Sequence, residues 1–126
     1  MIGVGIRSVL AAAATSVDSR VHPKKLPQNT SYPALTYEIV SDPRGHTHDG
    51  PDGRVEARVR VTAWSPSYAD VAEATGEVKD ALDGYLGAMG DVRVWSVRHT
   101  GGRDLYDSEV HVHHRPVDYI IQYTED

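Results

Sequence analysis

The sequence predicts a single α+β domain, residues 1–126, in which two helices pack on one face of a mainly antiparallel sheet of four to five strands. Residues 55–63 alternate strictly between apolar and polar side chains, as a strand with one buried face does. Two other segments place apolar residues at helical spacing. The predicted strands come in groups of two and three instead of alternating with helices, which favours an antiparallel sheet covered on one side. At 126 residues the chain is long enough for one hydrophobic core.

The first helix is expected over residues 2–18. The same segment resembles a secretory signal peptide, but no Lys or Arg precedes Ile2 and the apolar run is short. We therefore expect a helix, in a protein made in the cytoplasm. No run of the sequence approaches the ~18 apolar residues of a membrane span, so no membrane association is expected. The apolar side chains that recur on one face of the helix are Ile2, Ile6, Val9, Leu10, Ala13 and Val17.

Residues 21–33 are predicted to form a loop or extended arm, because three prolines prevent a regular helix there. Lys24 and Lys25 make this segment basic within an acidic protein. It is either a solvated connection or an arm that contacts a neighbouring subunit. Composition alone favours the solvated connection, since most charged loops face water.

Two strands are predicted at residues 34–41 and 55–63, because apolar and polar side chains alternate along both. The residues between them, about 42–54, are rich in Gly, Pro, Asp and His and are expected to form a flexible loop. Strands joined in this way form an antiparallel hairpin with one face on the core. Val59 and Val61 are expected on that buried face.

The second helix is expected to begin after Ser65 or Ser67. Pro66 suits a helix start, and Ser67 with Asp70 approximates a capping box. Glycines at positions 84, 87 and 90 are expected to end the helix. One apolar stripe is formed by Val71, Thr75, Val78, Leu82, Tyr85 and Met89.

Three further strands are predicted at residues 92–98, 105–114 and 117–123. Pro116 is expected to separate the last two strands or to mark a bulge at a sheet edge, because proline cannot donate to a sheet. The residues on which the core is expected to rest are Val59, Val61, Val78, Leu82 and Ile121.

Composition excludes several functions. The chain has no cysteine, so it has no disulfide, thiol nucleophile or Cys-based zinc site. Its formal net charge of −5 argues against the broad basic surface that nucleic-acid binding usually needs. No P-loop, Rossmann glycine pattern or serine-nucleophile motif is present. We therefore predict a protein that is not an enzyme, with no catalytic residue, cofactor or resident metal.

The seven histidines are the one feature that suggests metal chemistry. His111 and His113 would share one face of a strand and could hold a metal if further ligands approached. An ordinary polar strand face is the favoured interpretation, because this spacing is common by chance. His46 and His48 resemble part of the zinc motif of metallo-β-lactamase-like hydrolases. That match fails, because Asp49 comes one residue early and the next histidine is missing.

The order of motifs resembles the tail-completion, or tail-terminator, proteins of long-tailed bacteriophages and phage-like particles. The resemblance covers roughly residues 5–123 and rests on the ordered set more than on any one motif. Ala34 departs from the family, which usually has a bulky residue at that point. In chain order the matching features are an N-terminal helix, Pro27-Gln28 with Pro33, the strand Leu35-Thr36-Tyr37, a loop with His and Gly, the strand end Val61-Thr62-Ala63-Trp64, the helix start Ser67-Tyr68-Ala69-Asp70 and the strand Val117–Tyr123.

The resemblance implies a structural virion protein of the tail or neck, made in the host cytoplasm. By that analogy it forms a ring, commonly of six subunits, that caps the tail tube and docks the head. Its expected partners are further copies of itself, the tail-tube protein and a head-completion or connector protein; DNA passes through without specific binding. The residues expected at subunit or partner interfaces are Lys24, Lys25, His46, His48, Arg58, Arg60 and Trp64.

Two other functions stay open at this point. One is a head-side connector or neck protein of the same particle, which would bind the head side instead of the tail tube. The other, less favoured, is a small His-dependent metalloprotein, which would copurify with a metal ion.

Overall fold

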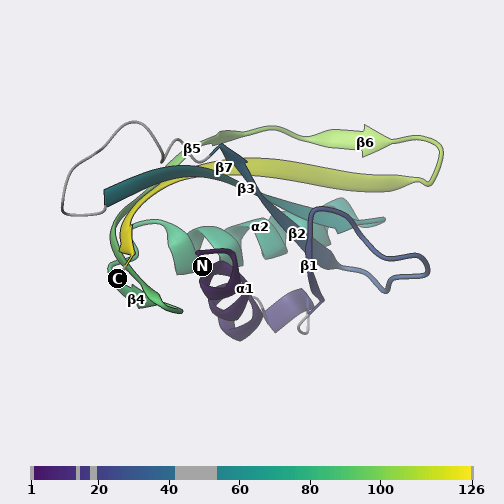
Figure 1. Cartoon of the computed structure of the whole chain (residues 1–126). Coiled ribbons are helices and arrows are strands. Elements are labelled where there is room, and N and C mark those ends of the chain that lie inside the picture. The colour runs from purple at the N-terminus through teal and green to yellow at the C-terminus, as the bar shows by residue number, and fades with distance from the viewer. Residues whose placement is uncertain (1, 14, 18–19, 42–53, 126) are drawn as a thin grey trace.

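In the computed structural model, a curved sheet lies over two helices (Figure 1). The structure describes residues 2–13, 15–17, 20–41 and 54–125. The expected loop at 42–53 lies outside the described residues, and Arg54 already belongs to a strand. The elements are α1 (Ile2–Ala13), the 3-10 helix η1 (Thr15–Val17), β1 (Val21–Pro23), β2 (Ala34–Ser41), β3 (Arg54–Ser65), α2 (Tyr68–Leu82), β4 (Gly87–Met89), β5 (Val92–Gly102), β6 (Leu105–Asp107) and β7 (Val112–Glu125).

The α+β class is confirmed, but the prediction of four to five mainly antiparallel strands is wrong. The sheet has seven strands in the order β1-β2-β3-β7-β5-β4, and β6 pairs with β7 beside β5. It is mixed, because β1 runs parallel to β2. Two strands, β1 and β4, lie outside the predicted ones, and β6 is only the start of the strand predicted at residues 105–114; each of the three is three residues long. Such strands are too short to show the alternation by which a strand is recognised in sequence.

Both helices lie on the same side of the sheet, as predicted (Figure 1). Their apolar faces and the inward side chains of β3, β5 and β7 form one core. None of the helices in the described ranges is long and apolar enough to cross a membrane. The residues on which the core was expected to rest are all buried: Val59, Val61, Val78, Leu82 and Ile121.

The first helix is shorter than the predicted range of 2–18. α1 ends at Ala13, and a 3-10 turn follows at Thr15–Val17. Ser16 turns toward α2, because its backbone N–H and its hydroxyl both donate to Glu77 Oε1, at 3.1 and 2.6 Å. These two tertiary hydrogen bonds hold Thr15–Val17 against α2 as a 3-10 turn instead of a continuation of α1.

The second helix starts as expected and ends earlier. Ser67 is the N-cap, and its hydroxyl accepts from the Asp70 N–H at 3.4 Å. The helix stops at Leu82, and Gly84 has a φ of 80°, a left-handed conformation that favours glycine. Met89, expected on the helix stripe, instead lies buried in β4. The helical spacing of its apolar side chain was coincidental.

Pro116 lies inside one long strand, so the prediction of two strands separated at this residue is wrong. β7 runs from Val112 to Glu125, and Pro116 faces Thr62 of β3. Its carbonyl accepts from the Arg103 N–H at 3.3 Å, in the short connection between β5 and β6. The N–H and C=O of a strand residue point the same way, so the missing N–H also faces this gap. Proline is tolerated where one neighbouring strand ends and another begins.

Two glycines in the helices are expected to respond in opposite ways to substitution by alanine, because only one of them packs against the sheet. A Cβ on Gly5 of α1 would lie 2.5 Å from the Met89 carbonyl oxygen, whereas a Cβ on Gly76 of α2 meets nothing within 4 Å. We expect Gly5→Ala to destabilise the fold by about 1–3 kcal/mol through overpacking. Gly76→Ala should stabilise it by about 0.5–1 kcal/mol through helix propensity. Denaturant unfolding measures both; equal effects of the two substitutions would contradict the packing described here.

Candidate subunit interface

The face of the sheet turned away from both helices carries three of the seven predicted site residues, Arg58, Arg60 and Trp64. We call it the outer face. Alternation along β3 and β7 places charged and aromatic side chains there while their neighbours enter the core. The residues that define it are Thr36, Glu38, Arg58, Arg60, Trp64, His114 and Asp118.

An arginine pair on β3 holds one carboxylate of β7. Arg60 and Asp118 are direct partners in the register of the two strands. Arg60 Nε donates to Asp118 Oδ1 at 2.8 Å, and its Nη2 donates to Oδ2 at 3.2 Å. Arg58 Nη1 lies 3.5 Å from the same Oδ2. The two hydrogen bonds from Arg60 make a bidentate arginine–carboxylate pair, which is stronger than a pair with one hydrogen bond.

The pair is electrostatically asymmetric. The Asp118 side chain is 18% exposed, whereas Arg58 and Arg60 are 43% and 40% exposed. Hydrogen bonding from Arg60 lowers the pKa of Asp118, against the opposing effect of burial. The same bond raises the pKa of Arg60. Asp118 is thus neutralised from within the subunit, while both guanidinium groups still reach solvent.

Trp64 is fixed at the end of β3 by two contacts. Its indole N–H donates to Thr36 Oγ1 of β2 at 2.9 Å. Its ring stacks on His114 of β7, with centroids 4.4 Å apart and planes 14° from parallel. Partial burial lowers the pKa of His114, which favours the neutral imidazole in this stack. Trp64 therefore presents a rigid, half-buried aromatic edge to the outer face.

A shallow pocket of about 390 Å³ lies between these two groups. Arg60 and Asp118 line one part of it, and Trp64 and His114 another. Arg103, from the connection between β5 and β6, also lines it. The outer face is hollowed where charge and aromatic surface meet, a shape that can receive a side chain from a partner.

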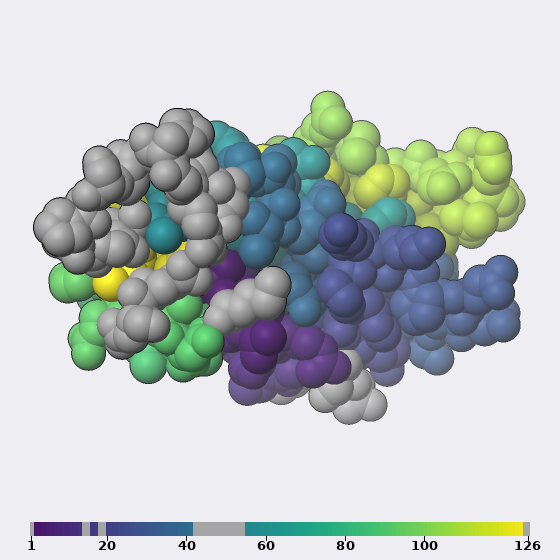
Figure 2. All heavy atoms as spheres, in the orientation of Figure 1, coloured from purple at the N-terminus to yellow at the C-terminus, as the bar shows by residue number. Residues whose placement is uncertain are grey.

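The two predicted lysines lie elsewhere. Lys24 and Lys25 are exposed and follow directly after β1, at the edge of the sheet. The Lys24 N–H donates to the Tyr37 carbonyl of β2 at 2.9 Å, so β2 separates the lysines from the arginines of β3. The segment after β1 and the β6–β7 hairpin project at the same end of the molecule (Figure 2).

The predicted site is therefore divided between two surfaces. Arg58, Arg60 and Trp64 share the outer face, while Lys24 and Lys25 occupy a sheet edge. His46 and His48 lie outside the described residues.

The histidines expected to share a strand face do not do so. His111 lies in the turn before β7 with a φ of 56°, whereas His113 is inside the strand. Within residues 2–13, 15–17, 20–41 and 54–125, no group of three or more His, Asp or Glu side chains could hold a metal ion.

Sequence reasoning missed Asp118 and His114 as members of the outer face. The alternation of Val117, Tyr119 and Ile121 did indicate that Asp118 points away from the core. It could not indicate that β7 pairs with β3, which is what brings Asp118 to Arg60.

Comparison with known proteins shows to which family the chain belongs. The family model described as tail completion protein gp17 matches residues 5–124. The chain belongs to this family. It is thus a structural protein of phage-like virions, located in the tail or neck, where it assembles with other tail and head proteins. The resemblance inferred from the ordered motifs is confirmed.

Solved structures show the same fold. A chain from a structure titled "Virion of native gene transfer agent (GTA) particle" superposes with a TM-score of 0.68 at 14% sequence identity. The match covers 92% of this tail completion protein and 84% of that chain. No curated protein matches the sequence.

The arginine–aspartate pair predicts a specific acid dependence of stability. The pKa of Asp118 is lower in the folded protein than in the unfolded chain. Ionised Asp118 therefore adds to the free energy of unfolding at any pH above its unfolded pKa. This stabilisation is lost as the pH falls through the folded pKa. Asp118→Asn should therefore be less stable than the parent at neutral pH. The difference should shrink below about pH 4, where aspartate begins to protonate in the unfolded chain. Urea unfolding from pH 7 to pH 2.5 tests this; a difference that does not change with pH would contradict it.

Proposed function

We propose that this protein caps the finished tail tube as a closed homo-oligomeric ring, of six subunits, and forms the surface to which the head docks. The observation that carries the proposal is the match of the tail completion model to residues 5–124, nearly the whole chain. The fold shared with a chain of a gene transfer agent virion supports it.

The two surfaces found above suit a ring. A closed ring needs a head-to-tail contact between two different patches on each subunit. The outer face supplies one patch, with Arg58, Arg60 and Trp64. The sheet edge with Lys24 and Lys25 supplies a second and separate one. Each subunit would then contact its two neighbours through different residues.

The outer face has the chemistry of an interface centre. Arginine and tryptophan are enriched among residues that carry binding energy, especially where they are already held in place. Trp64 is fixed by Thr36 and His114, and Arg60 by Asp118. Their conformations are therefore set before association, which lowers the entropic cost of binding.

The remaining partners follow from the position of such a ring. One end would contact the tail-tube protein and the other a head-completion or connector protein. His46 and His48 are proposed to contribute to these contacts. The formal net charge of −5 suits a channel through which DNA passes without binding. This role needs no catalytic step, so we propose that the protein is not an enzyme.

The ring proposal predicts that removing one outer-face cation weakens assembly. Arg58 is the suitable residue, because Arg60 makes the stronger pair with Asp118. Arg58→Gln should raise the concentration at which rings form by about tenfold, as expected for an interface arginine. Arg7→Gln, an exposed arginine on α1, removes the same charge from the helical side and should have no effect. Light scattering over a concentration series measures assembly, with and without tail-tube protein.

Three outcomes would contradict the proposal or the interface assigned to it. The parent protein could stay monomeric at every concentration and in every mixture. It could also bind a head-side connector while ignoring the tail tube, which would favour the connector function. Equal effects of Arg58→Gln and Arg7→Gln would show that overall charge, and not the outer face, controls assembly.

A further inference from the structure

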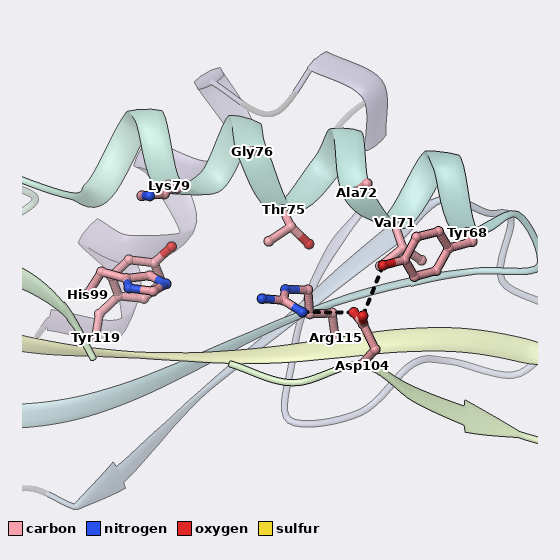
Figure 3. Close-up of a pocket in the computed structure, with 10 residues that line it drawn as sticks. All are labelled: Tyr68, Val71, Ala72, Thr75, Gly76, Lys79, His99, Asp104, Arg115 and Tyr119. Carbon is pink, nitrogen blue, oxygen red and sulfur yellow. Dashed lines mark hydrogen bonds and ion pairs between the residues drawn. The ribbon is translucent and has the colours of Figure 1, made fainter. Parts of the chain in front are cut away.

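A second pocket lies on the other side of the sheet, between α2 and the strands β5 and β7. Its volume is about 420 Å³, within the range of small-molecule sites. Figure 3 shows the α2 side chains Tyr68, Thr75 and Lys79 above it, and Arg115 and Tyr119 of β7 below. The pocket does not share a lining residue with the outer-face pocket.

Two hydroxyl groups in this pocket have no hydrogen-bond partner in the part of the chain that the structure describes. Tyr119 is fully buried, and its hydroxyl has no hydrogen-bond partner among the described residues. The same is true of the Thr75 hydroxyl, which is also buried. Buried polar atoms are nearly always paired, so each such exception requires an explanation. Burial raises the pKa of Tyr119 to about 12, which keeps its hydroxyl protonated and able to donate.

The one carboxylate that lines the pocket, Asp104, does not use up the hydrogen-bond donors of its arginine. Asp104 is already neutralised, since Arg115 Nη1 donates to its Oδ1 at 2.8 Å and the Tyr68 hydroxyl donates to its Oδ2 at 2.9 Å. These bonds hold the pKa of Asp104 below its usual value. Arg115 has further N–H groups beyond the one bonded to Asp104.

Lys79 adds a second cation from the last turn of α2. Asp83 carries a negative charge but does not line the pocket. It contributes to the raised pKa of Tyr119, and its Oδ1 accepts from the His99 backbone N–H at 3.3 Å. The pocket lining itself therefore has two cations and one carboxylate that is already bonded on both oxygens.

We propose that this pocket binds a carboxylate carried on a short apolar stem, as in a glutamate side chain. An ionised carboxylate is an acceptor-only group, which suits two hydroxyl donors, a lysine and an arginine. Val71 and Ala72 line the remaining wall and would contact the stem. The source is either an acidic segment of another protein in the particle or a free dicarboxylate. The proposal does not depend on ring formation.

The test uses three small molecules, two of which are peptides that differ only in the charge of one side chain. Acetyl-Ala-Glu-Ala-amide presents a peptide carboxylate, and acetyl-Ala-Gln-Ala-amide is its neutral match. Sodium glutarate presents the free dicarboxylate. Each is titrated at millimolar concentrations into the full chain, and the amide resonances of Thr75, Lys79 and His99 are followed by NMR.

The variants separate binding from folding. Tyr119→Phe and Thr75→Val each remove an unpartnered hydroxyl with little change of shape, so the melting temperature should stay the same or rise. Each should weaken the glutamyl peptide by about tenfold, the loss of one hydrogen bond to a charged group. Lys79→Gln should weaken it as well. Lys25→Gln is the control, because it removes another of the three lysines in the chain, at the far edge of the sheet. It should leave the affinity for the glutamyl peptide unchanged.

Each outcome bears on the proposal. Tighter binding of the glutamyl peptide than of glutarate supports a protein segment as the source, and the reverse supports a free dicarboxylate. Equal shifts with the glutaminyl peptide would overturn the carboxylate assignment. Absence of shifts with both the glutamyl peptide and glutarate would overturn the site. Unchanged affinity in Tyr119→Phe and Thr75→Val would also overturn it, because the pocket would then hold only water.

Discussion

The position of β7 in the centre of the sheet is the constraint on which the rest of the structure depends. This strand of 14 residues pairs with β3 on one side and with β5 and β6 on the other. Without it β3 and β5 would have no common neighbour, and the sheet over α1 and α2 would separate into two parts. Pro116 is compatible with this position only because its amide side faces the connection between β5 and β6.

The alternation of side chains along β7 gives the protein two chemically different faces. Asp118 points to the outer face and pairs with Arg60, while the next residue, Tyr119, points into the core beside α2. A shift of register by one residue would exchange them. It would bury the Asp118 charge away from its arginines, at a high desolvation cost. The ion pair on the surface therefore also helps to specify the packing beneath it.

The elements that could be predicted are those with a signal in their own stretch of sequence. The alternation in β3 and the cap at Ser67 are local signals, and both are confirmed. Pairing between distant strands has no local signal, so the contact of Asp118 with Arg60 could not be predicted. At Met89 a local signal was present but misleading. The helical spacing of apolar residues continued by chance beyond the helix into β4. The pocket beside Tyr119 also depends on tertiary structure, because it forms only where α2 crosses β7.

The most direct test of the central claim is hydroxyl-radical footprinting of the free protein and of the protein assembled with its tail tube. The claim is that the outer face, left open by the helices, is the surface used in assembly. Trp64 and His114 should become protected on assembly, while the exposed side chains of Val4 and Leu86, on α1 and near β4, should keep their reactivity. Protection of Val4 and Leu86 with unchanged oxidation of Trp64 would place the interface on the helical side and contradict the account.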